Sequence, residues 1–130
     1  MSDTEKCVSR IRRELHLAYH GKKFEYFDSV SGQEIKFDWD GAGIANKSIV
    51  LIELELGGIS EWHIQTHLSR LAIMIDQGTS IEKLVWIVDR GAFLTLKNAV
   101  DAWLTFFVPI CKVKLPNMEY RTPNGELLWA

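Results

Sequence analysis

The segment of residues 48–56, Ser-Ile-Val-Leu-Ile-Glu-Leu-Glu-Leu, constrains the fold more than any other part of the chain. Its branched apolar residues run on without the alternation of a half-exposed strand, which is typical of a strand covered on both faces. Gly57 and Gly58 end the segment. We therefore expect a central, doubly covered β-strand here.

Three helices are expected along the chain. Residues 3–19 follow a Ser2–Glu5 capping box and carry apolar residues at spacings of three and four, up to Gly21. Residues 60–77 begin at Ser60 and are followed by Gly78. Residues 93–107 carry a third apolar stripe, and Pro109 ends that helix.

Further strands are expected at residues 24–30, 35–40 and 84–88, with a late strand at 110–115. The glycine-containing segment 41–47 is expected to be a loop, and residues 118–129 to fold back as a hairpin around 123–125. This order predicts one α/β domain over residues 1–130, with a mixed central sheet and helices on both faces.

Composition excludes several classes of protein. The 130 residues are 47% hydrophobic and 25% charged with a net charge of −2, which argues against a disordered chain or a highly basic coat protein. The two cysteines match no metal-binding spacing and indicate a reducing compartment. The N-terminus has no apolar signal core, and the longest apolar run is far shorter than the about 20 residues of a membrane helix. We expect a cytoplasmic protein with no membrane partner.

Two acidic residues, Glu53 and Glu55, interrupt the most apolar strand and project from the same face of it. Buried carboxylates are paired, neutralised or bound to a metal, because isolating them costs several kcal/mol. An alternative is that this face simply emerges into solvent. Asp38 and Asp40 share the polar face of the preceding strand, and antiparallel pairing would bring them beside the glutamates. Carboxylates converging in this way favour a hard cation such as Mg²⁺ or Mn²⁺.

The order helix, hairpin, Asp-x12-Glu-x-Glu, helix, strand resembles the PD-(D/E)xK nuclease superfamily over roughly residues 4–89. The resemblance implies a restriction-endonuclease-like αβββαβ core, here with an extra C-terminal helix and hairpin. It further implies a divalent-metal-dependent endonuclease that hydrolyses phosphodiester bonds in DNA with Mg²⁺ or Mn²⁺ as cofactor.

Carried over residue by residue, the resemblance makes Asp40 and Glu53 metal ligands, with the Leu54 carbonyl as a further oxygen. Asp40 is preferred to Asp38 because Asp40 precedes Gly41, as in the Asp-Gly pair of some family members. Glu55 takes the position of the usual lysine, which marks an E-x-E variant. It could orient the attacking water or bind a second metal.

Two further correspondences concern charge. Lys36 or Lys47 could supply the positive charge that the usual lysine would have contributed. Glu14 is similar to an acidic residue often found in the first helix of the family.

The second expected helix adds His63, Gln65, His67 and Arg70. Its two histidines and arginine fall on the flank of the apolar stripe, where they could face the scissile phosphate. Gln65 is similar to a glutamine of some family members. The alternative is a solvated face with partly buried histidines. Zinc is disfavoured, because no glutamate follows the first histidine as in zincins.

A basic group near the N-terminus and in the later loop could contact the DNA backbone, although such a face is often only solvated. Its members are Arg10, Arg12, Arg13, Lys22, Lys23 and Lys47.

The leading hypothesis is thus a DNA endonuclease with Asp40, Glu53 and Glu55 at its centre. Because the chain has little room for a recognition module, it would act as a homodimer or with a partner that supplies specificity. The alternatives are a catalytically inactive module of the same fold that binds nucleic acid or a protein, and a structural or regulatory α/β protein.

Overall fold

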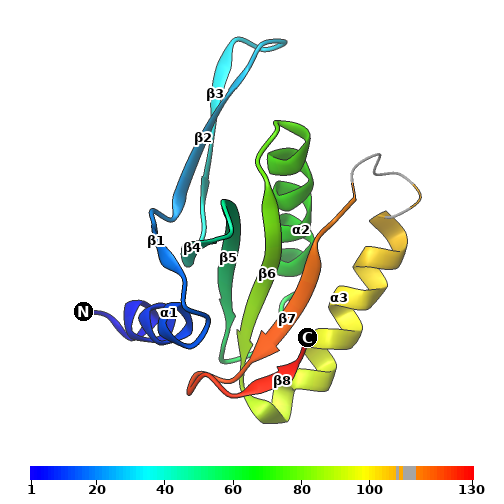
Figure 1. The fold of residues 1–130 in the computed structure, drawn as a ribbon. Coiled ribbons are helices and arrows are strands. Elements are labelled where there is room, and N and C mark those ends of the chain that lie inside the picture. The colour runs from blue at the N-terminus through cyan, green and yellow to red at the C-terminus, as the bar shows by residue number, and fades with distance from the viewer. Residues whose placement is uncertain (108, 110–113) are drawn as a thin grey trace.

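A mixed six-stranded sheet forms the centre of the computed structural model, which describes residues 1–107, 109 and 114–130 (Figure 1). The strand order is β1–β4–β5–β6–β7–β8, with β5, β6 and β7 parallel and the outer pairs antiparallel. These strands are β1 (Ala18–His20), β4 (Gly41–Ala45), β5 (Ser48–Glu55), β6 (Ile81–Val88), β7 (Asn117–Arg121) and β8 (Leu127–Trp129).

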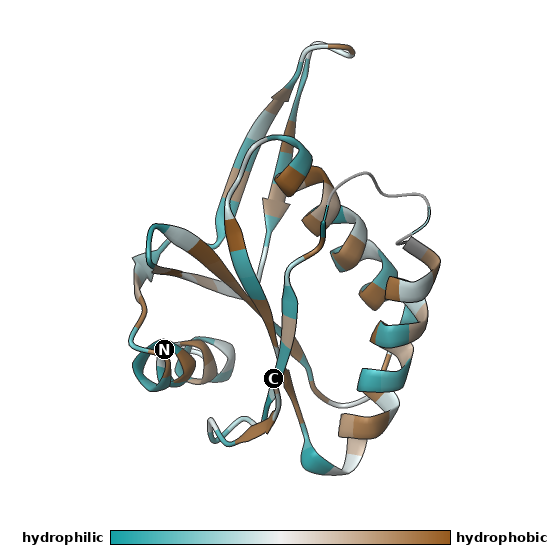
Figure 2. Cartoon of the chain, turned by 45° about the vertical axis from the view of Figure 1, so that its right-hand side comes forward, coloured by the Kyte–Doolittle hydropathy of each residue, from teal (hydrophilic) through white to brown (hydrophobic). Residues whose placement is uncertain are grey.

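Helices cover both faces of this sheet. Helix α1 (Asp3–Glu14) packs Val8 and Ile11 against Val50 and Ile52 of β5. On the opposite face α2 (Glu61–Asp76) and α3 (Phe93–Phe107) bury the second apolar cluster, which includes Leu51. Figure 2 shows the apolar strands between these helical layers. The predicted α/β class and the doubly covered central strand are confirmed.

Helix α1 ends earlier than its apolar spacing predicts. The Ser2 hydroxyl accepts a hydrogen bond from the Glu5 backbone N–H at 3.1 Å, so the expected N-cap is present. The helix ends at Glu14, and His16 adopts a left-handed conformation with φ of 53°. The predicted continuation to residue 19 is wrong, because the chain turns there to place β1 beside β4.

The segment predicted as a loop at 41–47 contains strand β4, paired with both β1 and β5. Gly41 and Gly43 do not end a strand here but lie where neighbouring side chains approach the backbone of β4 closely. A Cβ on Gly41 would overlap the Val8 side chain, and one on Gly43 would lie 2.8 Å from Leu17 Cβ. The absence of side chains thus lets α1 and the segment after it approach the sheet.

Strands β2 (Lys23–Asp28) and β3 (Gln33–Asp38) form a separate antiparallel hairpin that projects beyond the main sheet (Figure 1). One face of the hairpin buries Phe24 and Phe37, and the Tyr26 hydroxyl lies 2.6 Å from the Thr79 hydroxyl. The expectation that this return strand itself pairs with β5 is wrong: β4 takes that place. The first expected strand also ends two residues early, at Asp28.

The C-terminal half follows the predicted order. Helix α2 begins after Ser60, whose hydroxyl accepts from the His63 backbone N–H at 3.3 Å. A 3₁₀ turn, η1 (Arg90–Ala92), precedes α3. The expected hairpin is formed by β7 and β8, and the Thr122 N–H donates to the Glu126 carbonyl at 2.9 Å. The core of the strand predicted at 110–115, with Cys111, lies outside the described residues. Within the described part of the chain, no helix has the length and apolarity to cross a bilayer.

Candidate functional site

Glu53 and Glu55 are buried at the end of β5, on the face covered by α2. Their exposed fractions are 2% and 4%. The alternative in which this face emerges into solvent is therefore wrong. Both carboxyl groups are held in protein surroundings, where each requires a polar or charged partner.

Asp40 lies directly beside Glu53 because β4 and β5 are antiparallel neighbours. The backbone N–H of Asp40 donates to Glu53 Oε1 at 3.1 Å. The backbone N–H of Leu54 in turn donates to Asp40 Oδ2 at 2.8 Å. The predicted convergence of Asp40 with the glutamates is confirmed. Asp38 stays on the exposed hairpin face, 3.9 Å from Lys22 Nζ, and does not join them.

Two histidines of α2 contact the two glutamates. His63 Nδ1 lies 2.8 Å from Glu55 Oε1. His67 Nε2 forms an ion-pair contact with Glu53 Oε2, and the His67 ring lies against Trp39 with centroids 5.1 Å apart. His67 is 3% exposed, and its Nδ1 has no hydrogen-bond partner among the described residues.

These contacts shift the acid–base properties of the cluster. Burial raises the pKa of Glu53, and the neighbouring Asp40 and Glu55 carboxylates raise it further. Burial also raises the pKa of Glu55, which the contact with His63 partly offsets. Burial lowers the pKa of His67, and the nearby His63 and Arg70 act in the same direction. Both shifts favour the uncharged form of the group, a protonated Glu53 carboxyl and a neutral His67 imidazole.

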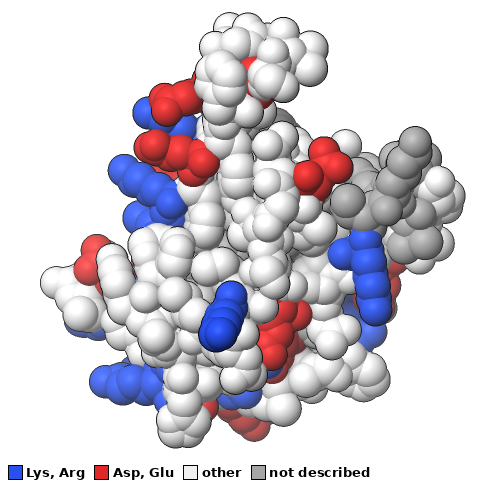
Figure 3. Space-filling model, turned by 45° about the horizontal axis from the view of Figure 1, so that its top comes forward, with Lys and Arg blue, Asp and Glu red and all other residues white. Residues whose placement is uncertain are grey.

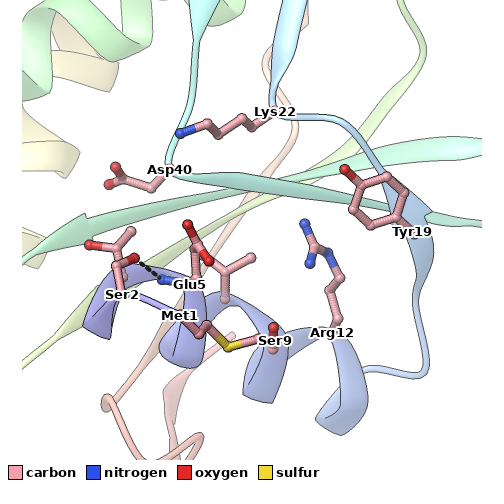
Figure 4. A pocket seen from close by; sticks show the side chains of 10 residues that line it. Met1, Ser2, Glu5, Ser9, Arg12, Tyr19, Lys22 and Asp40 are labelled. Atoms are coloured by element: carbon pink, nitrogen blue, oxygen red, sulfur yellow. Dashed lines mark hydrogen bonds between the residues drawn. The ribbon is translucent and has the colours of Figure 1, made fainter.

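A cavity of about 580 Å³ lies between α1 and the β1–β4 edge of the sheet (Figure 4). Asp40 lines it together with Glu5, Arg12, Tyr19 and Lys22. Figure 4 shows Lys22 extending toward Asp40, with Arg12 and Tyr19 farther along the cavity. The structure thus joins one candidate metal ligand to two of the candidate DNA-binding cations.

Three residues assigned from the family resemblance lie elsewhere. Glu14 is at the far end of α1 and lies against Gly125, whereas Glu5 is the α1 carboxylate that lines the cavity with Asp40. Lys36 is bound on the hairpin, 3.7 Å from Glu34. Lys47 is in the turn before β5, about 20 Å along the strand from Glu53 at about 3.3 Å per residue.

Sequence reasoning therefore missed Glu5 and Tyr19, and it assigned Lys22 only as a backbone contact. The spacing of Glu5 and Arg12, seven residues apart on one helix, was the available signal, since positions two turns apart share a face.

The remaining basic residues divide by role. Arg10 donates to the Pro123 carbonyl at 2.7 Å and ties α1 to the β7–β8 turn. Arg13 and Lys23 are exposed. Figure 3 shows Lys and Arg mixed with Asp and Glu on the face it presents, rather than a continuous basic surface there.

The other residues of α2 lie outside the acidic cluster. Arg70 packs over the Phe37 ring, 5.6 Å from its centroid. Gln65 lines a shallow depression on the outer face of α2 with Trp62 and Ile73. The expected basic face is therefore divided: His67 is buried against Glu53, whereas the exposed His63 lines a surface depression with Arg70.

The donor chemistry of the cluster fits a hard divalent cation. Asp40, Glu53 and Glu55 supply carboxylate oxygens, although burial, the main cause of the raised pKa of both glutamates, favours their uncharged forms when no cation is bound. In the described residues, no three His, Cys, Asp or Glu side chains are already grouped as a metal site. Both glutamates instead contact histidines.

Comparison of the chain with protein-family models, with curated proteins and with solved structures gave no match.

Proposed function

We propose that the chain is a divalent-metal-dependent endonuclease acting on DNA, with a restriction-endonuclease-like arrangement of its core. The observation that carries this proposal is the juxtaposition of Asp40 and Glu53. Two strands place these carboxyl groups together at the end of the sheet, and Asp40 also lines a cavity with Arg12 and Lys22. Asp40 thereby links the buried acidic cluster, which would hold a cation, to the cavity whose basic groups would bind a phosphate.

Asp40, Glu53 and the Leu54 carbonyl would hold Mg²⁺ or Mn²⁺, with Glu55 as an additional ligand. A bound divalent cation polarises a phosphoryl oxygen and lowers the pKa of a coordinated water. Hard oxygen donors are suited to these two ions.

The surrounding residues would position the substrate. In this proposal Lys22, which lines the cavity with Asp40 and lies 3.9 Å from Asp38, would neutralise charge on the phosphate instead of Lys36 or Lys47. Arg12 would bind the next phosphate along the cavity. The His63 hydrogen bond fixes the orientation of Glu55, so this carboxylate is already directed within the site.

A second function is favoured by the histidine contacts. His63 and His67 contact one carboxylate oxygen of each glutamate, in positions where a cation would otherwise bind, as expected of an inactive module of the same fold that binds DNA or a protein partner. The two functions differ in one property, which is whether a divalent cation displaces these contacts.

A nicking assay on supercoiled plasmid tests the leading proposal. The wild type is compared in Mg²⁺, Mn²⁺ and EDTA with Asp40→Asn and Glu53→Gln, which preserve side-chain shape. Glu34→Gln, on the exposed hairpin, is the matched control. We expect metal-dependent nicking that both site variants lose by about 100-fold or more and the control retains. Activity unchanged in Asp40→Asn and Glu53→Gln would exclude this site.

Calorimetric titration with Mn²⁺ separates the two functions. The nuclease binds Mn²⁺ in the wild type and not in Glu53→Gln. A wild type that neither nicks plasmid nor takes up Mn²⁺, yet binds DNA, would be the inactive module. Cleavage of both strands would also require two copies or a partner, which sedimentation on a DNA duplex measures.

A further inference from the structure

The Tyr19 side chain is an exposed aromatic group at the edge of the cavity described above. It is 76% exposed and lies on β1, the edge strand of the sheet. The Arg12 guanidinium lies over its ring, with Cζ 4.9 Å from the ring centroid. An exposed ring held beside a cation is a recurring element of surfaces that stack nucleic-acid bases.

The cationic side of this cavity is held in place. Arg12 Nε donates to the Ala42 carbonyl of β4 at 2.8 Å, which fixes the guanidinium between α1 and the sheet. Lys22 reaches into the same cavity on the side of Asp40 and is 53% exposed (Figure 4). The Glu5 carboxylate also faces the cavity, so a phosphate would lie on the side of Arg12 and Lys22.

We infer that this cavity binds an unpaired strand of DNA, with one base stacked on Tyr19 and the adjoining phosphates on Arg12 and Lys22. The inference rests on the proposed function and narrows its substrate to DNA with a single-stranded segment beside the cleaved bond. The cavity volume of about 580 Å³ lies within the about 300–1,000 Å³ of ligand pockets, which accommodates a nucleotide.

An unpaired strand suits this geometry better than a duplex. Bases of a duplex are already stacked on their neighbours, so Tyr19 could reach only the backbone or a terminal base pair. An unpaired base has a free face and gains the stacking energy directly. Tyr19 would therefore distinguish an unpaired strand from a duplex, whereas Lys22 would contact a phosphate, which both substrates have.

Fluorescence anisotropy in EDTA tests the inference without cleavage. A labelled 12-nucleotide single strand and the corresponding duplex are titrated with wild type, Tyr19→Ala and Tyr19→Phe. Phe27→Ala is the matched control, since Phe27 is a 64% exposed aromatic residue on the hairpin outside the cavity. We expect the wild type to prefer the single strand. Tyr19→Ala should weaken single-strand binding at least about fivefold and duplex binding less than twofold.

The controls separate stacking from folding. Tyr19→Phe and Phe27→Ala should bind as the wild type does, and thermal unfolding should show that Tyr19→Ala remains folded. Lys22→Gln should lower the slope of log affinity against log salt by about 0.7 for the single strand, since one phosphate contact is lost. Equal loss on both substrates in Tyr19→Ala, or no loss on either, would overturn the inference.

Failure of this inference is distinguishable from failure of the proposed function. Tyr19-dependent binding of the single strand by a protein that, with Mg²⁺ or Mn²⁺, cleaves neither plasmid nor a duplex carrying a single-stranded segment would support the binding site and contradict the nuclease. Metal-dependent nicking with no preference for a single strand would support the nuclease and overturn the inference.

Discussion

The Asp40 carboxylate accepts a hydrogen bond from the Leu54 backbone N–H, with 2.8 Å between Oδ2 and N. With the reciprocal bond from the Asp40 N–H to Glu53, it fastens the start of β4 to the end of β5. One side chain thus has a structural role and a proposed metal-binding role, and the two can be separated by substitution.

Asp40→Asn should separate these roles. An amide oxygen can still accept from the Leu54 N–H, so the free energy of unfolding should change little, while Mn²⁺ affinity falls because the negative charge is lost. Asp40→Ala should also lower the free energy of unfolding, by about 1–3 kcal/mol, since the N–H loses its partner. Urea unfolding and Mn²⁺ calorimetry measure the two effects. Equal stability of the two variants would contradict the structural role.

The Glu53–His67 pair predicts how stability depends on pH without metal. The pKa of Glu53 is raised from its ordinary value of 4.5, so this group destabilises the fold as pH rises above that value. The pKa of His67 is lowered from 6.5, so this group stabilises the fold as pH rises, and the gain is complete by about pH 6.5. Between pH 4.5 and 6.5 the gain in stability from His67 opposes the loss from Glu53. Above pH 6.5, of these two effects only the loss of stability from Glu53 continues.

We therefore expect the free energy of unfolding in EDTA to fall by at most about 1.4 kcal/mol per pH unit as pH rises from 7 to 9. The melting temperature should fall with it. Glu53→Gln should remove this slope, because an amide does not titrate. A slope of equal size in wild type and Glu53→Gln would assign the effect to other groups.

Gly41 predicts a specific stability coupling. Gly41→Ala should destabilise the protein by about 1–3 kcal/mol, because the new Cβ overlaps Val8 of α1. Val8→Ala removes the two methyl groups that come closest to the new Cβ, so Gly41→Ala combined with Val8→Ala should be more stable than the sum of the single effects predicts. Gly21→Ala is the control, since a Cβ there meets nothing within 4 Å. Additive effects in denaturant unfolding would contradict the overlap.

Arg10 should be a structural residue rather than a DNA contact. Its hydrogen bond to the Pro123 carbonyl joins α1 to the C-terminal hairpin, so Arg10→Ala should lower the free energy of unfolding by about 1 kcal/mol or more. DNA affinity measured by anisotropy should be unchanged. Arg13→Ala, an exposed neighbour, should change stability by less than about 0.5 kcal/mol. A larger loss of DNA affinity in Arg10→Ala than in Arg12→Gln would reverse this assignment.

The central strand and its acidic residues were predictable because their pattern is local. Residues 48–56 combine continuous apolar character with two carboxylates, and the structure has both glutamates buried there. Asp40 was predictable as their neighbour, since the chain has only a short distance in which to return. Strand β4 was not, because Gly41 and Gly43 locally indicate a break.

The cavity was less accessible to sequence reasoning. It joins Glu5 and Arg12 on α1 to Tyr19 on β1, and the position of β1 depends on the left-handed residue His16. Apolar spacing continued a helix through this point, which would have placed Tyr19 on a helix face. Glu14 was assigned as the acidic residue of the first helix from its residue type alone. Only the packing of α1 on β4 shows that Glu5 is the one beside Asp40.

The residue before Asp40 separates the projecting hairpin from the site. Trp39 is 2% exposed, its Nε1 donates to Met74 Sδ at 3.2 Å, and its backbone N–H donates to the Lys22 carbonyl at 3.0 Å. This anchor fixes the chain immediately before the candidate ligand. The outer part of the hairpin can therefore be shortened, lengthened or replaced without shifting Asp40, which makes it a natural position for grafting foreign recognition sequences onto this scaffold.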